Sequence, residues 1–126
     1  MEAAARVRQS SRVIETIAND ATRWSALRTI DICTVRSFVV RDEHSGQTVS
    51  LTSESWDGRA RLELTFLRVV DLKVDWSGPT PAQLDVLDIR DASADGLENI
   101  SYRVADGADF FSLWCSDFFA VVILDS

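Results

Sequence analysis

The segment DASADG is the part of this sequence whose residue types and spacing come closest to a known kind of site. Asp91, Ser93 and Asp95 occupy the first, third and fifth positions of a calcium-binding loop, and the glycine required at the sixth follows them. The twelfth position, which must supply a bidentate Glu carboxylate, is Tyr102, and both flanks alternate like strands rather than helices. The segment therefore predicts a polar turn and no calcium site.

Other reactive side chains are too sparse or too exposed to predict a catalytic site. His44, the single histidine, lies beside Asp42 and Glu43 in a segment typical of an exposed hairpin tip, where nothing desolvates an imidazole to tune its pKa. Cys33 and Cys115 stand in apolar, strand-like surroundings without C-x-x-C spacing, so we expect buried free thiols; a disulfide would need adjacent strands and an oxidising compartment. Nucleophile-elbow and phosphate-binding motifs do not occur, and we expect no enzyme activity, metal or cofactor.

Acidic residues provide the strongest remaining signal. The formal net charge is −7, and residues 77–126 hold nine acidic residues against two arginines, which accounts for the whole imbalance. Such a surface repels nucleic acid and anionic membranes and attracts basic proteins over about 8 Å at physiological salt. The series has two interpretations, a solvated face that maintains solubility or a docking surface for a basic protein. Its members are Asp85, Asp88, Asp91, Asp95, Glu98, Asp106, Asp109 and Asp117.

Two of the four tryptophans are further candidates for partner contact. Trp56 in ESWDGR and Trp76 in VDWSGP lie beside turns, where a half-exposed indole can anchor another protein. The alternative is that both residues lie at the edge of the core. Trp24 and Trp114 fall within periodic apolar segments, and we expect both to be buried.

The elements that must position these residues fit one domain over residues 1–126. The apolar fraction of 46% and the charged fraction of 26% are typical of globular proteins. The longest apolar run near the end, Phe118 to Leu124, is far shorter than the ~20 residues of a membrane-spanning helix. The arginines near the start precede no apolar block of the secretory type, so we expect a cytoplasmic protein.

Residues 2–22 predict one amphipathic helix, so that residues 1–22 form an N-terminal helical segment. Neither Gly nor Pro occurs there, and apolar or small residues recur at alternating steps of four and three from Ala3 to Trp24. This helix either packs on the protein's own sheet or pairs with another chain, which would make residues 2–22 the contact of a homo-oligomer.

Residues 27–126 predict a β domain of seven to eight strands. Alternating apolar residues are interrupted by turn signals about every ten residues, a pattern typical of a curved antiparallel sheet or a β-sandwich. The segment from Phe110 to Ser126 predicts a hairpin that turns at Ser116–Asp117. Because Phe118 and Phe119 are apolar on opposite faces, we expect its second strand to be a core strand that is covered on both sides.

One pattern of core residues resembles a known group of proteins. Ile100, Tyr102, Val104 and Asp106 form an I-x-Y-x-V-x-D strand, and the stretch WCSDF at residues 114–118 follows it. Over roughly residues 60–124 this succession is similar to small β-rich bacterial immunity proteins of polymorphic toxin systems. The resemblance implies a cytosolic antidote that binds a cognate toxin, often a basic nuclease, and blocks it by occlusion. It implies no catalytic residues.

Three functions follow as hypotheses. The first is an acidic, non-enzymatic binding protein that neutralises a basic toxin. The second is a structural or assembly subunit that oligomerises through residues 2–22. The third is a small-ligand-binding β domain, for which a deep apolar pocket with convergent polar groups is needed.

Overall fold

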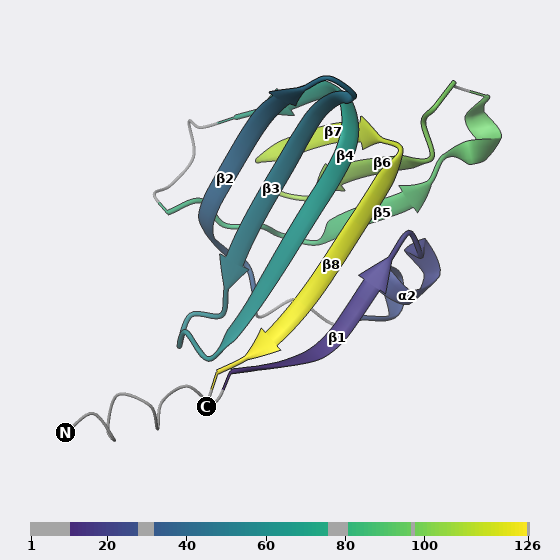
Figure 1. The fold of residues 1–126 in the computed structure, drawn as a ribbon. Helices are drawn as coiled ribbons and strands as arrows, with labels where there is room; N and C mark the ends of the chain where they lie inside the picture. The colour runs from purple at the N-terminus through teal and green to yellow at the C-terminus, as the bar shows by residue number, and fades with distance from the viewer. Residues whose placement is uncertain (1–10, 28–31, 76–80, 97, 126) are drawn as a thin grey trace.

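The fold is a curled antiparallel sheet with one short helix, and the fold class expected from the sequence is confirmed (Figure 1). The computed structural model describes residues 11–27, 32–75, 81–96 and 98–125. The elements in chain order are β1 (Arg12–Ala18), α2 (Ala21–Ala26), β2 (Thr34–Glu43), β3 (Gly46–Glu54), β4 (Ala60–Val74), β5 (Leu87–Asp91), the 3-10 turn η1 (Ser93–Asp95), β6 (Tyr102–Asp106), β7 (Phe111–Cys115) and β8 (Asp117–Leu124). That the chain forms a single domain stays a prediction.

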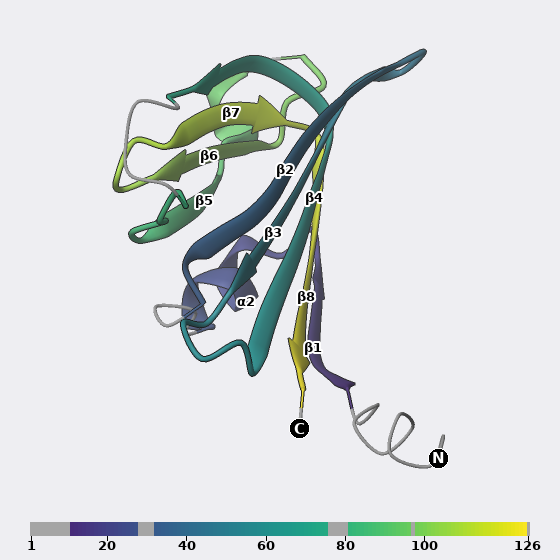
Figure 2. The same ribbon diagram turned by 90° about the vertical axis from the view of Figure 1, so that its left-hand side faces the viewer.

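Strand β4 organises the sheet because its two halves belong to two layers. Its first half pairs with β3 and β8, and β2 and β1 extend this part outward to give layer A, in the order β2-β3-β4-β8-β1. Its second half pairs with β7, which β6 and β5 extend to give layer B. Figure 2 shows layer A edge-on, with β5, β6, β7 and α2 all on one side of it.

The bend between the layers lies at Arg68 and Asp71 of β4, both with a φ of 53°. Left-handed backbone at a non-glycine residue interrupts the pleat and turns the strand. The segment between β7 and β8 turns next to this bend, where the Ser116 backbone N–H donates to the Leu67 carbonyl at 3.1 Å. The predicted hairpin at Ser116–Asp117 is therefore wrong. β7 and β8 do not pair with each other but follow one another along the 15-residue β4, which is long enough to pair with both.

The core fills the space between the two layers. Phe66, Phe111 and Phe118 are fully buried there, and the rings of Phe66 and Phe111 are tilted against each other at 6.2 Å. Each large side chain removed from water contributes roughly 1.5–3 kcal/mol. The expectation that β8 is covered on both faces is wrong, because Phe119 is 36% exposed on the outer side of layer A. Trp114 is half-buried rather than buried, because it faces outward from layer B.

The predicted helix over residues 2–22 is wrong where the structure describes this segment. Residues 2–10 lie outside the described residues, and Arg12–Ala18 form β1, which pairs antiparallel with β8. The β domain thus includes a strand that precedes residue 27. The run RVIETIA is rich in β-branched residues, which suit a strand, and the free edge of β8 offers a complete ladder of hydrogen bonds. Tertiary pairing outweighs the helical spacing.

Helix α2 closes the gap between the two ends of the curled sheet. Asp20 caps it by accepting a hydrogen bond from the Arg23 backbone N–H at 3.0 Å. Its buried Trp24 donates from Nε1 to the Leu87 carbonyl of β5 at 2.9 Å. Within the described part of the chain, no helix has the length and apolar character needed to cross a membrane.

Candidate functional site

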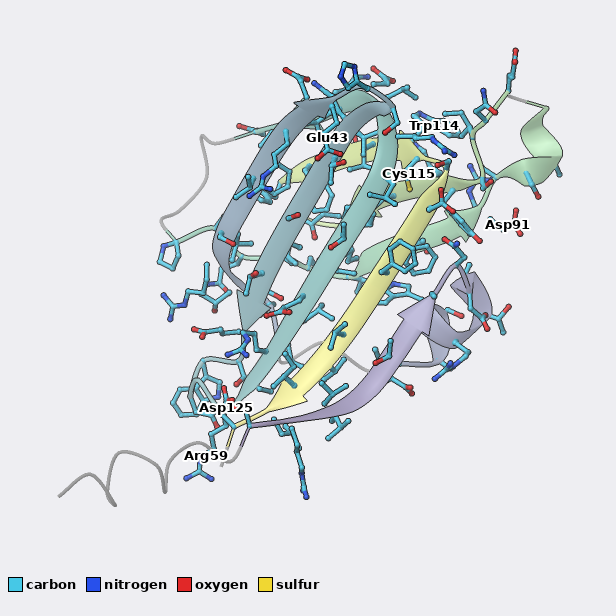
Figure 3. All side chains as sticks on the ribbon, viewed as in Figure 1. Glu43, Arg59, Asp91, Trp114, Cys115 and Asp125 are labelled. Carbon is cyan, nitrogen blue, oxygen red and sulfur yellow. The ribbon has the colours of Figure 1, made fainter. Side chains whose placement is uncertain are left out.

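The predicted acidic residues gather around β5 and the turns next to it, as Figure 3 shows for Asp91 at the end of this strand. Five members of the series are exposed, namely Asp85, Asp88, Asp91, Glu98 and Asp109. Asp117 lies half-buried at the start of β8. Asp95 belongs to η1, but its side chain is not among those described, and Trp76 lies outside the described residues.

Asp106 does not belong to this surface, which corrects the sequence prediction. It is 2% exposed, and its carboxylate accepts hydrogen bonds from the backbone N–H groups of Asp85 at 2.8 Å and Phe110 at 3.1 Å. One carboxylate satisfies both backbone donors, and a hydrogen bond to a charged acceptor is roughly twice as strong as a neutral one. Asp106 therefore holds the loop before β5 and the turn after β6 together and cannot contact a partner.

Asp91 ends β5 and organises the turn that the sequence predicts. Its carboxylate accepts hydrogen bonds from the Ser93 hydroxyl at 2.6 Å and from the Ser93 backbone N–H at 2.9 Å. These two bonds favour the charged form and lower the pKa of Asp91 below its ordinary value. No group of three or more potential ligand side chains in the described residues has a metal-binding arrangement.

Carboxylates of three elements converge on the buried phenol of Tyr102. Burial raises the pKa of Tyr102, and the negative charges of Asp91, Asp117 and Asp20 raise it further. The hydroxyl donates to the Asn19 carbonyl at 2.8 Å, which links β6 to the end of β1. Asp20 is not in the acidic series because that series was drawn from residues 77–126. Its position before α2 is nevertheless a recognisable N-cap signal.

Cations interrupt the acidic surface on the outer side of layer B. Arg90 and Arg103 lie directly opposite each other on β5 and β6. The Arg103 guanidinium lies 5.1 Å from the ring centre of Trp114, within cation–π range. Asp88 lies on the same face, two residues before Arg90, so acids and cations share it.

A hollow of about 300 Å³ opens beside these residues. Its lining mixes cations, carboxylates and one aromatic ring, and includes Lys73, Arg103, Asp109, Phe111 and Ser112. Opposite charges line the same walls, so the hollow does not select a ligand of either sign. It is not the deep apolar pocket that the small-ligand hypothesis needs.

Among the remaining candidates, Trp56 lies at the surface, and its contact with a partner stays a prediction. It lies in the loop between β3 and β4 and is 87% exposed. His44 is exposed at the β2–β3 turn. Cys115 is fully buried, and this burial together with the nearby Asp117 raises the pKa of its thiol to about 12, which prevents thiolate chemistry near neutral pH. Cys33 is half-buried, and both cysteines are free thiols.

Sequence reasoning missed the outer face of layer A. No described element lies in front of it in Figure 1, and in Figure 2 α2 and layer B both lie on the other side of layer A. Cross-strand register places Ala18, Phe119, Thr65, Ser50 and Val39 in one row across β1, β8, β4, β3 and β2. The sequence does contain a pattern that indicates this face: along these strands, Ser, Thr and apolar residues alternate with the core residues.

Comparison with known protein families gives a match. The model of the family described as immunity protein PIM8 matches residues 12–121. No curated protein and no solved structure matches the chain.

Proposed function

The chain belongs to the family of immunity protein PIM8, and from this premise we propose that it binds a basic toxin and neutralises it by occlusion. The family membership supports a toxin-neutralising role and implies a toxin as the partner. It is the single observation that carries the proposal. The basic character of the toxin and the blocking mechanism are the finer parts that we add.

Surface charge supports a basic partner. The chain has a formal net charge of −7, and five carboxylates of the acidic series are exposed around β5 and its turns. Such a field accelerates the diffusional encounter with a basic protein by about 10-fold to 1,000-fold at low salt. Rapid capture suits an antidote, because every unbound toxin molecule remains active.

Occlusion needs only a stable complex and no reaction. A complex in which the immunity protein covers the toxin's active site, or the path to it, blocks the substrate without changing either chain covalently. We therefore propose a non-enzymatic mechanism that uses no cofactor. Cytoplasmic residence is part of the proposal, because the antidote must meet the toxin where the toxin acts.

The assembly-subunit hypothesis loses its structural basis over Arg12–Ala18. The helix face on which it rested is here a strand of the sheet, with Ile17 fully buried in the core. We do not retain oligomerisation through a helix spanning residues 2–22.

Charge reversal tests the role of the acidic surface. The double variant Asp88→Lys and Glu98→Lys changes two exposed acids beside β5, and the control variant Asp42→Lys and Glu43→Lys makes the same change in net charge at the β2–β3 hairpin tip. The probe is a toxin identified among the products of the genes that flank the gene for this chain and inactivated at its active site, and the measurement is its association rate constant by stopped flow at low and high salt.

We expect the β5 variant to associate roughly tenfold more slowly than wild type at low salt, with a weaker salt dependence. The hairpin variant is expected to lose clearly less. Equal losses in both variants, or no loss in either, would refute steering by this surface. Wild-type protein that does not bind the toxin would refute the proposed function itself.

A further inference from the structure

We propose that the outer face of layer A is the surface on which the toxin docks. The inference rests on the proposed function and specifies which part of the molecule forms the contact. It assigns separate roles to two surfaces: the acids around β5 guide the approach, and the sheet face of layer A forms the contact.

The composition of this face differs from the rest of the surface. Two adjacent rows of residues cross all five strands, and none of the ten residues is buried. Glu63 alone among them is charged, whereas 26% of the whole chain is charged. The first row is Ala18, Phe119, Thr65, Ser50 and Val39, and the second is Thr16, Val121, Glu63, Thr52 and Ser37.

Depletion of charge with exposed apolar residues is typical of the central part of a protein interface. Phe119 and Val39 are 36% and 40% exposed in these rows. The hydroxyl groups between them supply hydrogen-bond donors and acceptors that a partner's polar groups can match.

Charged residues border the two rows as internally paired groups. At one end Arg36 pairs with Glu54 at 2.7 Å, and Arg61 pairs at 3.3 Å with Glu63, the one acid inside the second row. At the other end Arg68 lies 3.9 Å from Asp117. A partner that covers the rows therefore leaves no unpaired charge at these positions, and the arrangement matches the apolar centre and polar rim of known interfaces.

The face is large enough to form most of one contact surface. The two rows span about 24 Å across five strands spaced by about 4.8 Å and about 14 Å along them, roughly 330 Å². With the charged border, over about eight residues of each strand, the face reaches roughly 600 Å². One partner in a standard interface contributes about 800 Å². Trp56, 87% exposed on the loop that joins β3 and β4, extends the face at one end.

Net charge favours a basic toxin over a second copy of this chain as the occupant. Two copies would each bring a formal charge of −7, and their mutual repulsion opposes a face-to-face dimer. The surface on the toxin that fits is an uncharged patch with exposed apolar and hydrogen-bonding groups.

The test places a charge at the centre of the face. Ser50→Lys on β3 introduces an ammonium group between Val39 and Thr65. The control Ala105→Lys on β6 makes the same change in net charge on the outer side of layer B, opposite Asp88.

A second face variant, Phe119→Ser, removes an apolar contact without adding charge. Each variant is first compared with wild type by urea unfolding, and binding of the same inactivated toxin is then followed by surface plasmon resonance.

We expect Ser50→Lys and Phe119→Ser to raise the dissociation rate constant at least about tenfold, with association changed little. The Ala105→Lys control is expected to dissociate within about twofold of the wild-type rate, and only its association is expected to slow, because its charge lies opposite Asp88. If wild type binds and both face variants dissociate at the wild-type rate, the docking face is refuted while the proposed function stands.

Two further outcomes also count against the proposal. Wild-type protein that does not bind the toxin removes the proposed function and the docking face with it. A wild-type dimer in multi-angle light scattering that Ser50→Lys converts to a monomer would show that the face takes a second copy. If Ser50→Lys does not fold, Phe119→Ser decides the question, because its side chain is already partly exposed.

Discussion

Replacement of Asp106 by Asn separates a structural role for this residue from a role in partner binding. The side chain is 2% exposed, and its two carboxylate oxygens accept from the Asp85 and Phe110 backbone N–H groups at 2.8 and 3.1 Å. An Asn amide of the same shape retains one acceptor oxygen and presents an NH2 group to the second donor. One buried backbone N–H therefore loses its partner.

The expected cost follows from that single loss. A hydrogen bond to a charged group contributes about 1.5–3 kcal/mol, and a buried donor without a partner costs about 1–3 kcal/mol. We expect Asp106→Asn to lower the free energy of unfolding by about 2–3 kcal/mol and the urea midpoint by about 1 M. Asp106→Ala removes both acceptors and is expected to cost about twice as much, a large part of the stability of an ordinary domain.

Urea unfolding followed by tryptophan fluorescence measures this loss, with Asp109→Asn as the control. Asp109 lies three residues further along the same turn and is exposed, so its replacement is expected to change the free energy of unfolding by less than about 0.5 kcal/mol. An Asp106→Asn protein with a wild-type midpoint but weakened toxin binding would refute the structural role and return Asp106 to the contact surface.

Three further predictions concern single side chains. Folding raises the pKa of Cys115 from 9.0 to about 12, so between pH 9 and 10 the folded chain retains a thiol proton that the unfolded chain releases. The free energy of unfolding should therefore fall as pH rises. Cys115→Ala should reduce the slope of that fall by up to about 1.4 kcal/mol per pH unit in urea titrations. Equal slopes in both proteins would contradict the burial of the thiol. Ser93→Ala removes the hydroxyl that donates to Asp91, so the pKa of Asp91 should rise toward its ordinary value in an NMR titration, and an unchanged pKa would exclude that hydrogen bond as its cause. Trp24→Phe keeps a buried ring but loses the bond to the Leu87 carbonyl, and a loss of about 1–3 kcal/mol in thermal unfolding is expected, whereas no loss would show that the bond contributes nothing.

The strand content could be predicted from the sequence because alternation reports burial directly. Leu62, Leu64 and Phe66 alternate with polar residues, and all three are buried on the inner face of β4. The alternation shifts phase near Val69, which predicts a bulge or a strand pair there, and the register shifts around this residue agree with a bulge. The alternation does not predict that left-handed backbone at Arg68 and Asp71 turns β4 from one layer into the other. The sequence also did not predict that β7 and β8 pair with β4 instead of with each other, because that pairing depends on the same bend.

The candidate site could be predicted by residue type but not by exposure. Exposed Asp88 and buried Asp106 both alternate with apolar neighbours, and only the tertiary fold shows that backbone donors surround one of them. The outer face of layer A emerges only from register, because Val39, Ser50 and Phe119 are far apart in the chain and become neighbours through the pairing of β2, β3, β4 and β8.

Titration of toxin activity with purified immunity protein tests the central claim most directly. The cognate toxin is held at a concentration far above the dissociation constant, and its residual activity is measured as the immunity protein is added. Neutralisation by occlusion predicts a linear fall to zero at one equivalent, with both chains recovered intact from the complex. Full activity at several equivalents, or complete inhibition by a small fraction of an equivalent, would contradict the account.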